Sequence, residues 1–325
     1  MKISGFTFIK NAEKLYIPAK ESILSILPIC DEFIIAIGDN DIGDNTLKII
    51  QSIQSEKIKI IHTKWNTKDY PKNTIFAHQT DIAKQHCKGD WLFYLQCDEA
   101  IHQNDLETIK KACDDHLDDK SVDGFLFHYL HFWGDYNHFH NSHSWYKKEI
   151  RIIRNLPSIH SWKDAQSFRK FTKWEGGTFN DYTTKKYNAK LNVIELNVHV
   201  FHYGYVRPPK LMSTKRKSSS TSYHGKSAKK IISQIAQEYD YGPLNKLKKY
   251  QGTHPSVMKE WISQFNWSSQ LQYTGNRNKK RNPHKHEKFK YRLLSFIENT
   301  FLNGEVIGGF KNYTIIEKSE IREEK

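Results

Sequence analysis

Cysteine is scarce in this 325-residue chain, which holds only Cys30, Cys87, Cys97 and Cys113. These four form no CxxC pair and lack the spacing of a disulfide framework, so neither a structural zinc site nor a disulfide scaffold is indicated. Long apolar runs are also missing, since no stretch approaches the roughly 18 to 20 apolar residues of a membrane span. The apolar run at the N-terminus is too short for a signal peptide. We therefore expect a cytoplasmic protein in a reducing compartment, either soluble or peripheral at a membrane.

Acidic residues are the minority charge. The chain has 36 Asp and Glu against 50 Lys and Arg, a net charge of +14. Such an excess suits nucleic acid, an anionic membrane surface or small phosphorylated ligands as partners, and charge alone does not choose among them. A lysine-rich composition can also reflect only the base composition of a genome. Hydrophobic residues make up 38% of the chain, which is enough to build a core for one large domain or two smaller ones.

Two phosphate-binding motifs are absent as well. Lys10-Asn11 follows the first predicted strand where a dinucleotide-binding unit would have GxGxxG, and no GxxxxGK[ST] loop occurs. What the first 120 residues do contain is a regular alternation of strand and helix patterns. Strands are predicted at 3–9, 33–37, 58–62 and 91–95, with helices near 18–27, 46–54, 74–87 and 104–116. This order predicts an α/β fold with a mostly parallel central sheet flanked by helices.

The remainder of the chain divides by composition. Further strands are predicted at 122–133, 149–154 and 192–202, which extends the α/β domain over residues 1–207. Residues 208–230 are rich in Ser, Lys and Arg and are predicted to form a basic flexible loop. Residues 231–325 carry scattered helical patterns and are predicted to be a mainly helical C-terminal extension. The pattern at 291–301 suits either an interfacial helix in peripheral contact with a membrane or a helix that completes the core.

Polar residues end the most apolar predicted strand. Gln96, Cys97, Asp98 and Glu99 directly follow the run Trp-Leu-Phe-Tyr-Leu at 91–95. Ligands of open α/β sheets bind at the carboxyl ends of the strands, where a carboxylate can hold a hard cation and, through it, a phosphate. The alternative is that Asp98 and Glu99 only begin a solvated loop or cap the next helix.

Four stretches, in this order, resemble glycosyltransferase family 2, whose members have the GT-A fold and use nucleotide sugars. They are Phe6–Glu13, Ile35–Asp39 with the following Asp44-Asn45-Thr46, Ala77–Ala83 leading into Gly89–Asp98, and His202–Arg207. The resemblance covers roughly residues 3–215 and implies a GT-A catalytic domain at 1–207. One departure lies in the DxD metal motif of the family, because Gln96 stands at the position of its first Asp.

The resemblance implies a metal and donor site. Asp98 and His202 would hold Mn²⁺ or Mg²⁺, which neutralises the departing diphosphate, and Gln96 would hydrogen-bond a ribose hydroxyl. The further residues expected to bind the nucleotide or donor are Thr7, Phe8 and Asn11 at the base, Asp39 at the base or ribose, Gln79 and Asp81 at the donor sugar or diphosphate, and Arg207 at the phosphates. Lys210 and Lys215 follow Arg207 and suit either a phosphate clamp on a closing loop or a solvated basic loop.

An inverting enzyme needs one carboxylate that takes the proton of the acceptor hydroxyl. Asp164 is the predicted base, because Lys163-Asp164 stands where the family has an acidic pair; Asp181 and Glu175 are the alternatives. The nearby aromatic residues, including Trp145 and Tyr146, suit stacking on sugars or packing in the core.

The sequence therefore predicts an inverting, metal-assisted glycosyltransferase. Its donor would be a UDP- or GDP-sugar and its acceptor a saccharide, a lipid-linked molecule or a protein, with no nucleic-acid partner. A nucleotidyltransferase of related fold is one alternative, although it would favour a glycine-rich basic loop after the first strand. A basic nucleic-acid-binding protein is another, and it explains the charge of residues 215–230 but not the acidic strand ends.

Overall fold

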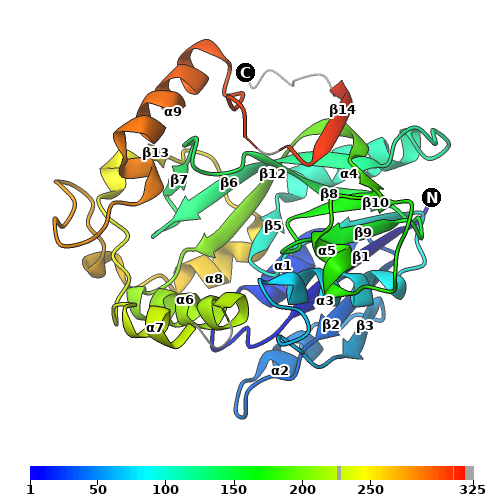
Figure 1. The fold of residues 1–325 in the computed structure, drawn as a ribbon, viewed down its shortest axis with the longest axis horizontal. Helices are drawn as coiled ribbons and strands as arrows, with labels where there is room; N and C mark the ends of the chain where they lie inside the picture. Colours follow the sequence, from blue (N-terminus) through cyan, green and yellow to red (C-terminus); the bar gives the residue numbers. More distant parts are fainter. Residues whose placement is uncertain (225–227, 310, 319–325) are drawn as a thin grey trace.

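A mixed sheet forms the centre of the computed structural model, which describes residues 1–224, 228–309 and 311–318 (Figure 1). In the first part of the chain the strands are β1 (Ile3–Ile9), β2 (Glu32–Ile37), β3 (Ile58–His62), β4 (Trp91–Tyr94) and β5 (Glu99–Ile101), and the helices are α1 (Ala19–Ile26), α2 (Thr46–Gln51), α3 (Thr74–Gln85) and α4 (Leu106–Asp115). Strands β4, β1, β2 and β3 are neighbours in that order and all run parallel. The expected α/β class, with a mostly parallel central sheet flanked by helices, is confirmed.

Side chains alternate between the two faces of this parallel half, as the period of two in a strand requires. Phe33 and Ile35 of β2 face one core with residues of α1, α2 and α4. Ile34 and Ala36 face the opposite core with residues of α3. Both faces are therefore covered, which explains why these strands read as unbroken apolar runs.

The second part of the chain extends the sheet with antiparallel neighbours. Its elements are β6 (Gly124–Trp133), β7 (His138–His140), β8 (Lys148–Arg154), β9 (Ile159–Trp162), β10 (Ser167–Phe171), α5 (Phe179–Thr183), β11 (Asn188–Ala189) and β12 (Leu191–Tyr205). Strand β8 lies antiparallel between β4 and β6, while β12 runs parallel to β6 and antiparallel to β5. Strands β9, β10 and β11 form a separate small sheet that packs beside α3.

The expectation of a loop at 208–230 is wrong for most of that segment. Helix α6 (Pro209–His224) occupies it, and α7 (Ala228–Ser233) follows. Only one side of α6 is anchored, through buried Pro209, Met212 and Ser213. Lys and Arg are good helix formers, and Thr214 and Thr221 donate their hydroxyls to carbonyls one turn earlier. The helix therefore forms without the apolar stripe that would reveal it in the sequence.

The last part of the chain is joined to the sheet. Its elements are β13 (Lys248–Lys249), α8 (Lys259–Ser263), α9 (Phe289–Phe301) and β14 (Tyr313–Lys318), with short 3₁₀ turns between them. Strand β13 pairs with β7, and β14 runs parallel to β12. Trp133, Tyr203, Leu244 and Trp267 belong to a third, aromatic-rich core that fixes the irregular segments. Among the described residues no helix has the length and apolar character needed to cross a membrane.

A buried ion pair joins the turn after β4 to the next strand of the sheet. Arg151 of β8 donates from Nη2 to Glu99 Oε1 at 2.8 Å and from Nε to Oε2 at 2.9 Å, and both side chains are fully buried. Tyr129 of β6 donates its hydroxyl to the same carboxylate at 2.8 Å. The oxygens of Glu99 are therefore used within the core, and Glu99 does not begin a solvated loop.

Replacing Arg151 by Met should therefore destabilise the fold strongly. The change leaves the Glu99 carboxylate buried without its counter-charge, a loss expected to cost about 3 to 5 kcal/mol. Urea unfolding at neutral pH measures it. Lys111→Met is the matched control, because it breaks an exposed i,i+4 pair with Asp115 and should cost no more than about 0.5 kcal/mol. Equal losses in the two variants would contradict the assignment.

A second ion cluster holds β12 at its middle. Glu195 lies 3.0 Å from His128 Nε2 and 2.7 Å from Lys148 Nζ. Burial raises the pKa of Glu195, but these two partners outweigh it and bring the pKa to about 2. A carboxyl whose pKa is lower in the folded state stabilises the fold above its ordinary pKa and loses that contribution as the pH falls.

Glu195→Gln should therefore lower stability in a pH-dependent way. At pH 7 the variant loses charge-assisted hydrogen bonds worth about 1.5 to 3 kcal/mol. The difference from the wild type should shrink as the pH falls from about 4.5 to about 2, where the wild-type carboxyl gains its proton. Urea midpoints measured across this range provide the check, and a difference that stays constant with pH would count against the cluster.

Candidate active site

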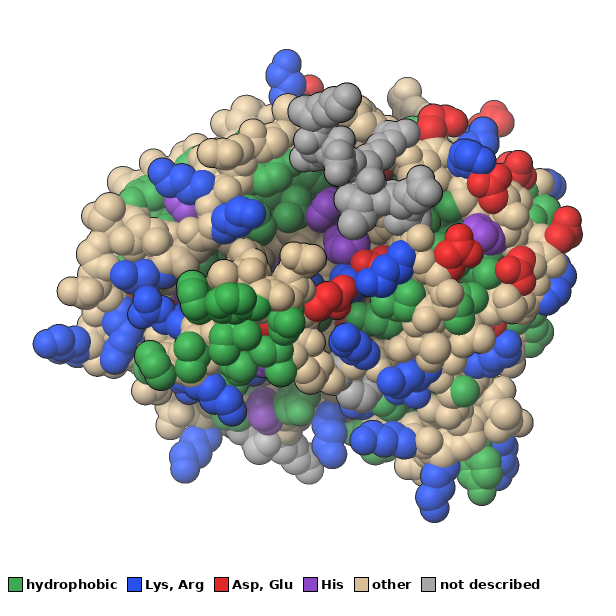
Figure 2. Space-filling model, turned by 90° about the horizontal axis from the view of Figure 1, so that it is seen from above, with side chains coloured by type: hydrophobic (Ala, Val, Ile, Leu, Met, Phe, Trp, Pro, Cys, Tyr) green, Lys and Arg blue, Asp and Glu red, His purple; other side chains and the backbone are tan. Residues whose placement is uncertain are grey.

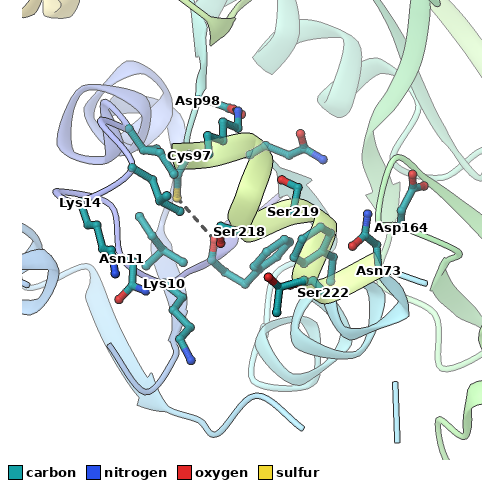
Figure 3. Close-up of a pocket in the computed structure, with 18 of the residues that line it drawn as sticks. Lys10, Asn11, Lys14, Asn73, Cys97, Asp98, Asp164, Ser218, Ser219 and Ser222 are labelled. Atoms are coloured by element: carbon teal, nitrogen blue, oxygen red, sulfur yellow. Dashed lines mark hydrogen bonds and ion pairs between the residues drawn. The ribbon is translucent and has the colours of Figure 1, made fainter. Parts of the chain in front are cut away.

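A cavity of about 760 Å³ lies at the carboxyl ends of β1, β4 and β12. Figure 3 shows Lys10, Asn11 and Lys14 on one side of it and Asn73 and Asp164 on the other. Helix α6 forms a further wall, from which the hydroxyl residues Ser218, Ser219 and Ser222 face the cavity. A volume of this size is typical of pockets that hold a cofactor or a nucleotide-sized ligand.

Aromatic side chains line the part of the cavity near the end of β1. Phe8 stacks on Phe76 of α3, with ring centroids 5.5 Å apart, and Trp65 lies 5.8 Å from Phe8. Asn11, with a positive φ of 55°, accepts the N–H of Asp41 on its side-chain oxygen and so fixes the neighbouring turn. A flat apolar surface beside lysine and amide groups suits a nucleobase next to its phosphates.

The turn after β4 presents Asp98 to the cavity because its ends are fixed. The N–H of Gln96 donates to Glu99 Oε2 at 3.1 Å, and the N–H of Glu99 donates to the Gln96 carbonyl at 2.9 Å. Ser22 of α1 also donates to that carbonyl. The carboxylate of Glu99 thus points inward to Arg151 while the next residue back, Asp98, points outward.

Asp98 lies between two basic groups. Lys215 Nζ of α6 lies 2.9 Å from its Oδ2, and His202 Nε2 at the end of β12 lies 3.9 Å from its Oδ1. Burial raises the pKa of the Asp98 carboxyl, but Lys215 and His202 outweigh it and hold that pKa well below its ordinary value. Burial and Arg207 lower the pKa of Lys215 to about 8. The carboxyl of Asp98 is therefore ionised at neutral pH.

A chain of hydrogen bonds sets which nitrogen of His202 faces Asp98 with a lone pair. His131 Nε2 lies 2.8 Å from the Tyr146 carbonyl, which can only accept, so this nitrogen carries the proton. Burial lowers the pKa of His131 well below its ordinary value, so its Nδ1 accepts. His202 Nδ1 lies 2.9 Å away and must donate. Neutral His202 then has its lone pair on Nε2, toward Asp98, as a metal ligand requires.

Gly204 leaves room for this pair. A Cβ at that position would lie 2.4 Å from His202 Nε2 and 2.9 Å from Asp98 Oδ2, so any side chain would displace both the imidazole and the carboxylate. The carbonyl of Gly204 also accepts from Lys215 Nζ at 3.0 Å. The segment His-Tyr-Gly at the end of β12 therefore provides the imidazole that faces Asp98, the space beside it and a carbonyl that binds Lys215.

Asp164 lies across the cavity, in a tight turn between β9 and β10. Its two neighbours, Lys163 and Ala165, have positive φ angles of 57° and 62°, an uncommon conformation for such residues that holds the turn in one shape. Gln96 donates its side-chain amide to the Ala165 carbonyl at 3.3 Å. Burial raises the pKa of Asp164 above its ordinary value. Gln96 thus ties the turn of Asp98 to the turn of Asp164.

The structure brings part of the predicted site together. The predicted residues that line the cavity are Phe8, Asn11, Gln96, Asp98, Asp164 and His202, with Lys215. The remaining predicted residues are engaged elsewhere. Thr7 is buried, with its hydroxyl 3.3 Å from Cys97 Sγ, and Asp39 accepts from Lys10 Nζ and the Trp65 N–H.

Two predicted donor residues on α3 need a correction. Gln79 is buried and accepts from the Thr63 hydroxyl, while Asp81 accepts the N–H of Ser161 at 2.9 Å and contacts His160. Both are buried on the face of α3 that packs against the protein, where Gln79 contacts the residue after β3 and Asp81 positions β9; neither lines the cavity. Asp181, an alternative base, is likewise used in the capping box of α5.

Arg207 is fully buried beside the site. Its Nη1 donates to the Leu15 carbonyl at 2.7 Å, whereas Nε and Nη2 have no hydrogen-bond partner among the residues that the structure describes. Its charge helps to hold the pKa of Asp98 down. Arg207 therefore acts on Asp98 through its field, from behind the cavity wall.

Several cavity residues are not evident from the sequence. Trp65 and Phe76 have no motif that marks them, and the serines of α6 were assigned to a loop. His131 does not line the cavity, and it contributes through its hydrogen bond with His202. The one available signal was the His-Tyr-Gly run, since glycine next to a ligand often marks a close approach.

The residues present fit a divalent cation. Asp98 Oδ1 and the Nε2 lone pair of His202 face the same space, and a carboxylate with an imidazole suits Mn²⁺ or Mg²⁺. In the described part of the chain no cluster of three or more His, Cys, Asp or Glu could hold a metal. The protein would thus supply two ligands, and phosphate oxygens and water the others.

Comparisons with protein-family models and with curated proteins give no match. Among solved structures, the chain is similar to residues 1–349 of TarS from S. aureus, with 14% identity over 68% of this chain and a TM-score of 0.38. The chain covers 65% of that structure's length. The complex of TarS 1–349 with UDP-GlcNAc matches at 12% identity, 72% of this chain, 71% of that chain and a TM-score of 0.34.

A second similar protein is glucosyl-3-phosphoglycerate synthase from Mycobacterium tuberculosis, solved with Mn²⁺, UDP and phosphoglyceric acid. It matches at 13% identity over 40% of this chain and 43% of that chain, with a TM-score of 0.28. All these scores lie below 0.5, so the function has to be argued from the geometry of the cavity.

Gly204→Ala tests whether the cavity is a binding site. The added methyl group should push His202 away from Asp98, and overpacking of this kind costs about 1 to 3 kcal/mol. We expect Mn²⁺-dependent binding of UDP or GDP to weaken roughly tenfold or more, which is about that free energy. Calorimetry measures the affinity. Gly252→Ala, at an exposed glycine whose neighbour is the Tyr250 side chain, is the control and should bind normally. Unchanged binding in Gly204→Ala would contradict the assignment.

Proposed function

We propose that this chain is a GT-A glycosyltransferase of family 2 that moves a sugar from a nucleoside-diphosphate sugar to an acceptor hydroxyl. One observation carries the proposal: a single cavity joins an aromatic and basic wall, an Asp98–His202–Lys215 group and the half-buried Asp164. Such a transfer needs three parts. The aromatic and basic wall would hold the nucleobase, the Asp98–His202–Lys215 group the diphosphate, and Asp164 would serve the reacting sugar.

The nucleotide end of the donor would bind at Phe8, Phe76 and Trp65. Their rings offer a stacking surface, and Lys10 and Asn11 lie beside it at the end of β1. Stacking on aromatic side chains tolerates any base, so the geometry suits UDP and GDP alike. Gln96 remains the candidate for a ribose hydroxyl.

The diphosphate would lie at Asp98, where positive charge converges. Lys215 Nζ is already directed at this point, and Arg207 adds charge from behind the wall. When bound by Asp98 and His202, Mn²⁺ or Mg²⁺ supplies electrostatic stabilisation of the leaving diphosphate. Lys215 would donate to phosphate oxygens, and α6 would keep water from the reacting bond.

Asp164 would take the proton of the acceptor hydroxyl as it attacks, on the opposite side of the cavity from Lys10 and Lys14. Burial raises the pKa of Asp164, which makes it a stronger base than a solvated aspartate. Direct attack by an acceptor hydroxyl that a single base activates would invert the anomeric carbon. Trp145 and Tyr146 line the cavity as well and suit an acceptor sugar, whether that acceptor is a saccharide, a lipid-linked molecule or a protein.

Nucleotide binding provides the direct test. Calorimetry with UDP and with GDP, each with and without Mn²⁺, should show binding that is tighter with the metal, and Asp98→Ala should lose the metal-dependent part. Lys111→Ala, an exposed change far from the cavity, should keep it. Absence of nucleotide binding, together with tight and salt-sensitive binding of DNA or RNA, would favour the nucleic-acid alternative and contradict the proposal.

Asp164→Asn separates binding from chemistry. The variant keeps the shape of the turn but lacks the base, so UDP affinity should stay within a few-fold while transfer falls by about 10² to 10⁴. A screen of nucleotide sugars for donor hydrolysis identifies the donor, and single-turnover transfer by the wild type and the variant then measures the loss. Parallel losses of affinity and rate would show that Asp164 only supports the fold of the site.

A further inference from the structure

Helix α9 has its polar side toward the protein and its apolar side toward solvent. A surface helix of a globular protein normally buries its apolar side. In α9 the exposed fractions are 78% for Phe289, 47% for Leu293, 59% for Phe296 and 70% for Phe301. Spacings of four and three residues place the first three of these on one side of the helix.

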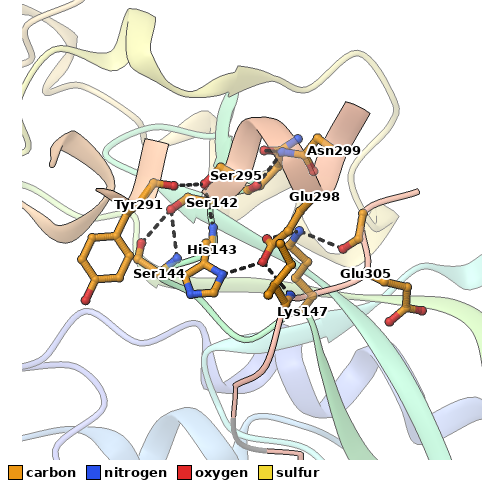
Figure 4. Close-up of polar contacts among 12 residues, drawn as sticks. Ser142, His143, Ser144, Lys147, Tyr291, Ser295, Glu298, Asn299 and Glu305 are labelled. Carbon is orange, nitrogen blue, oxygen red and sulfur yellow. Dashed lines mark hydrogen bonds and ion pairs between the residues drawn. The ribbon is translucent and has the colours of Figure 1, made fainter. Parts of the chain in front are cut away.

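The polar side of α9 is bound firmly to the loop after β7 (Figure 4). Glu298 is fully buried and accepts from His143 Nδ1 at 2.5 Å, with Lys147 Nζ at 3.4 Å. The N–H of His143 donates to the Ser295 hydroxyl at 2.9 Å, and Asn299 donates to the Asn141 side chain. These contacts fix the rotation of the helix, so its outward apolar side is built into the fold.

Basic residues surround this apolar side. Eight Lys and Arg fall within residues 277–292, against one acid, Glu287, which is bound by Arg281. Lys288, Lys290 and Arg292 are exposed. Figure 2 shows hydrophobic side chains gathered over the position of α9, with Lys and Arg side chains beside them.

We propose that α9 docks the protein on an anionic membrane surface, lying in the plane of the interface. Exposed phenylalanine and leucine on one side, bordered by Lys and Arg, are the features of an interfacial helix. A helix of 13 residues extends about 20 Å, too short to cross the ~30 Å hydrocarbon layer. Anionic headgroups complement the charge of the basic residues at 277–292, whereas an apolar partner protein would leave that charge without a complement. This inference does not depend on glycosyl transfer.

Vesicle flotation of the full chain tests the proposal. The wild type should float with vesicles of phosphatidylcholine and phosphatidylglycerol and remain unbound with phosphatidylcholine alone. Phe289→Ser combined with Phe296→Ser should weaken binding roughly tenfold or more, because both rings leave the interface. Ile42→Ser, which removes a fully exposed apolar residue elsewhere, should bind as the wild type.

A charge series separates docking from general attraction. Replacing Lys288, Lys290 and Arg292 by Gln should weaken binding about 100-fold, at about 1 kcal/mol for each charge. Replacing Lys110, Lys185 and Lys186 by Gln removes as much charge from other exposed positions and should have little effect. Equal losses in the two triple variants would overturn the proposal.

Two further outcomes would also overturn it. One is a wild-type protein that floats with neither kind of vesicle. The other is a concentration-dependent dimer, seen by light scattering, that Phe289→Ser with Phe296→Ser dissolves without any change in flotation; this would assign the apolar side to a second copy of the chain. The urea midpoint of each variant, compared with that of the wild type, confirms that the fold is intact.

Discussion

The contact between Glu99 and Arg151 is the constraint on which the candidate site depends. A charge pair so deeply buried is held only where its hydrogen bonds are complete, and here Tyr129 and the Gln96 N–H complete them. Because Glu99 is fixed inward, Asp98 must face outward. The pair also joins β5 to β8 within the sheet, so the position of the site is set by the core.

Positive charge is concentrated around Asp98. Lys215 and the buried Arg207 lie near this carboxylate, and the cavity wall adds Lys10 and Lys14, which are paired with Asp39 and Asp41. In a buried setting such an arrangement favours ligands that bring several negative charges. The same residues explain why a net charge of +14 says little by itself: part of it serves the cavity and another part lies around α9.

Much of the architecture could be predicted from the sequence, because β1, β2 and β4 are buried on both faces and read as apolar runs. Asp98, His202 and Asp164 line one cavity; the first two do so because strand ends meet at one edge, whereas Asp164 comes from the turn between β9 and β10. Thr7 does not line the cavity although Phe8 does, because adjacent strand residues point to opposite faces. Gln79 and Asp81 lie on the buried side of α3, which the pattern of a half-polar helix does not reveal. Helix α9 was recognised by its spacing, but periodicity does not tell which side faces the protein.

The pairing of β14 with β12 has a consequence for how the chain folds. Strand β14 covers Leu191–Glu195 of β12 from more than a hundred residues later in the sequence. Contacts of such high separation form late and slowly, so the early strands can assemble while this margin of the sheet is still bare. An uncovered strand margin is prone to pair with other chains. Strand β14 therefore protects the edge of β12. Truncation before β14 would leave this edge exposed, and the shortened protein would aggregate more readily than the full chain.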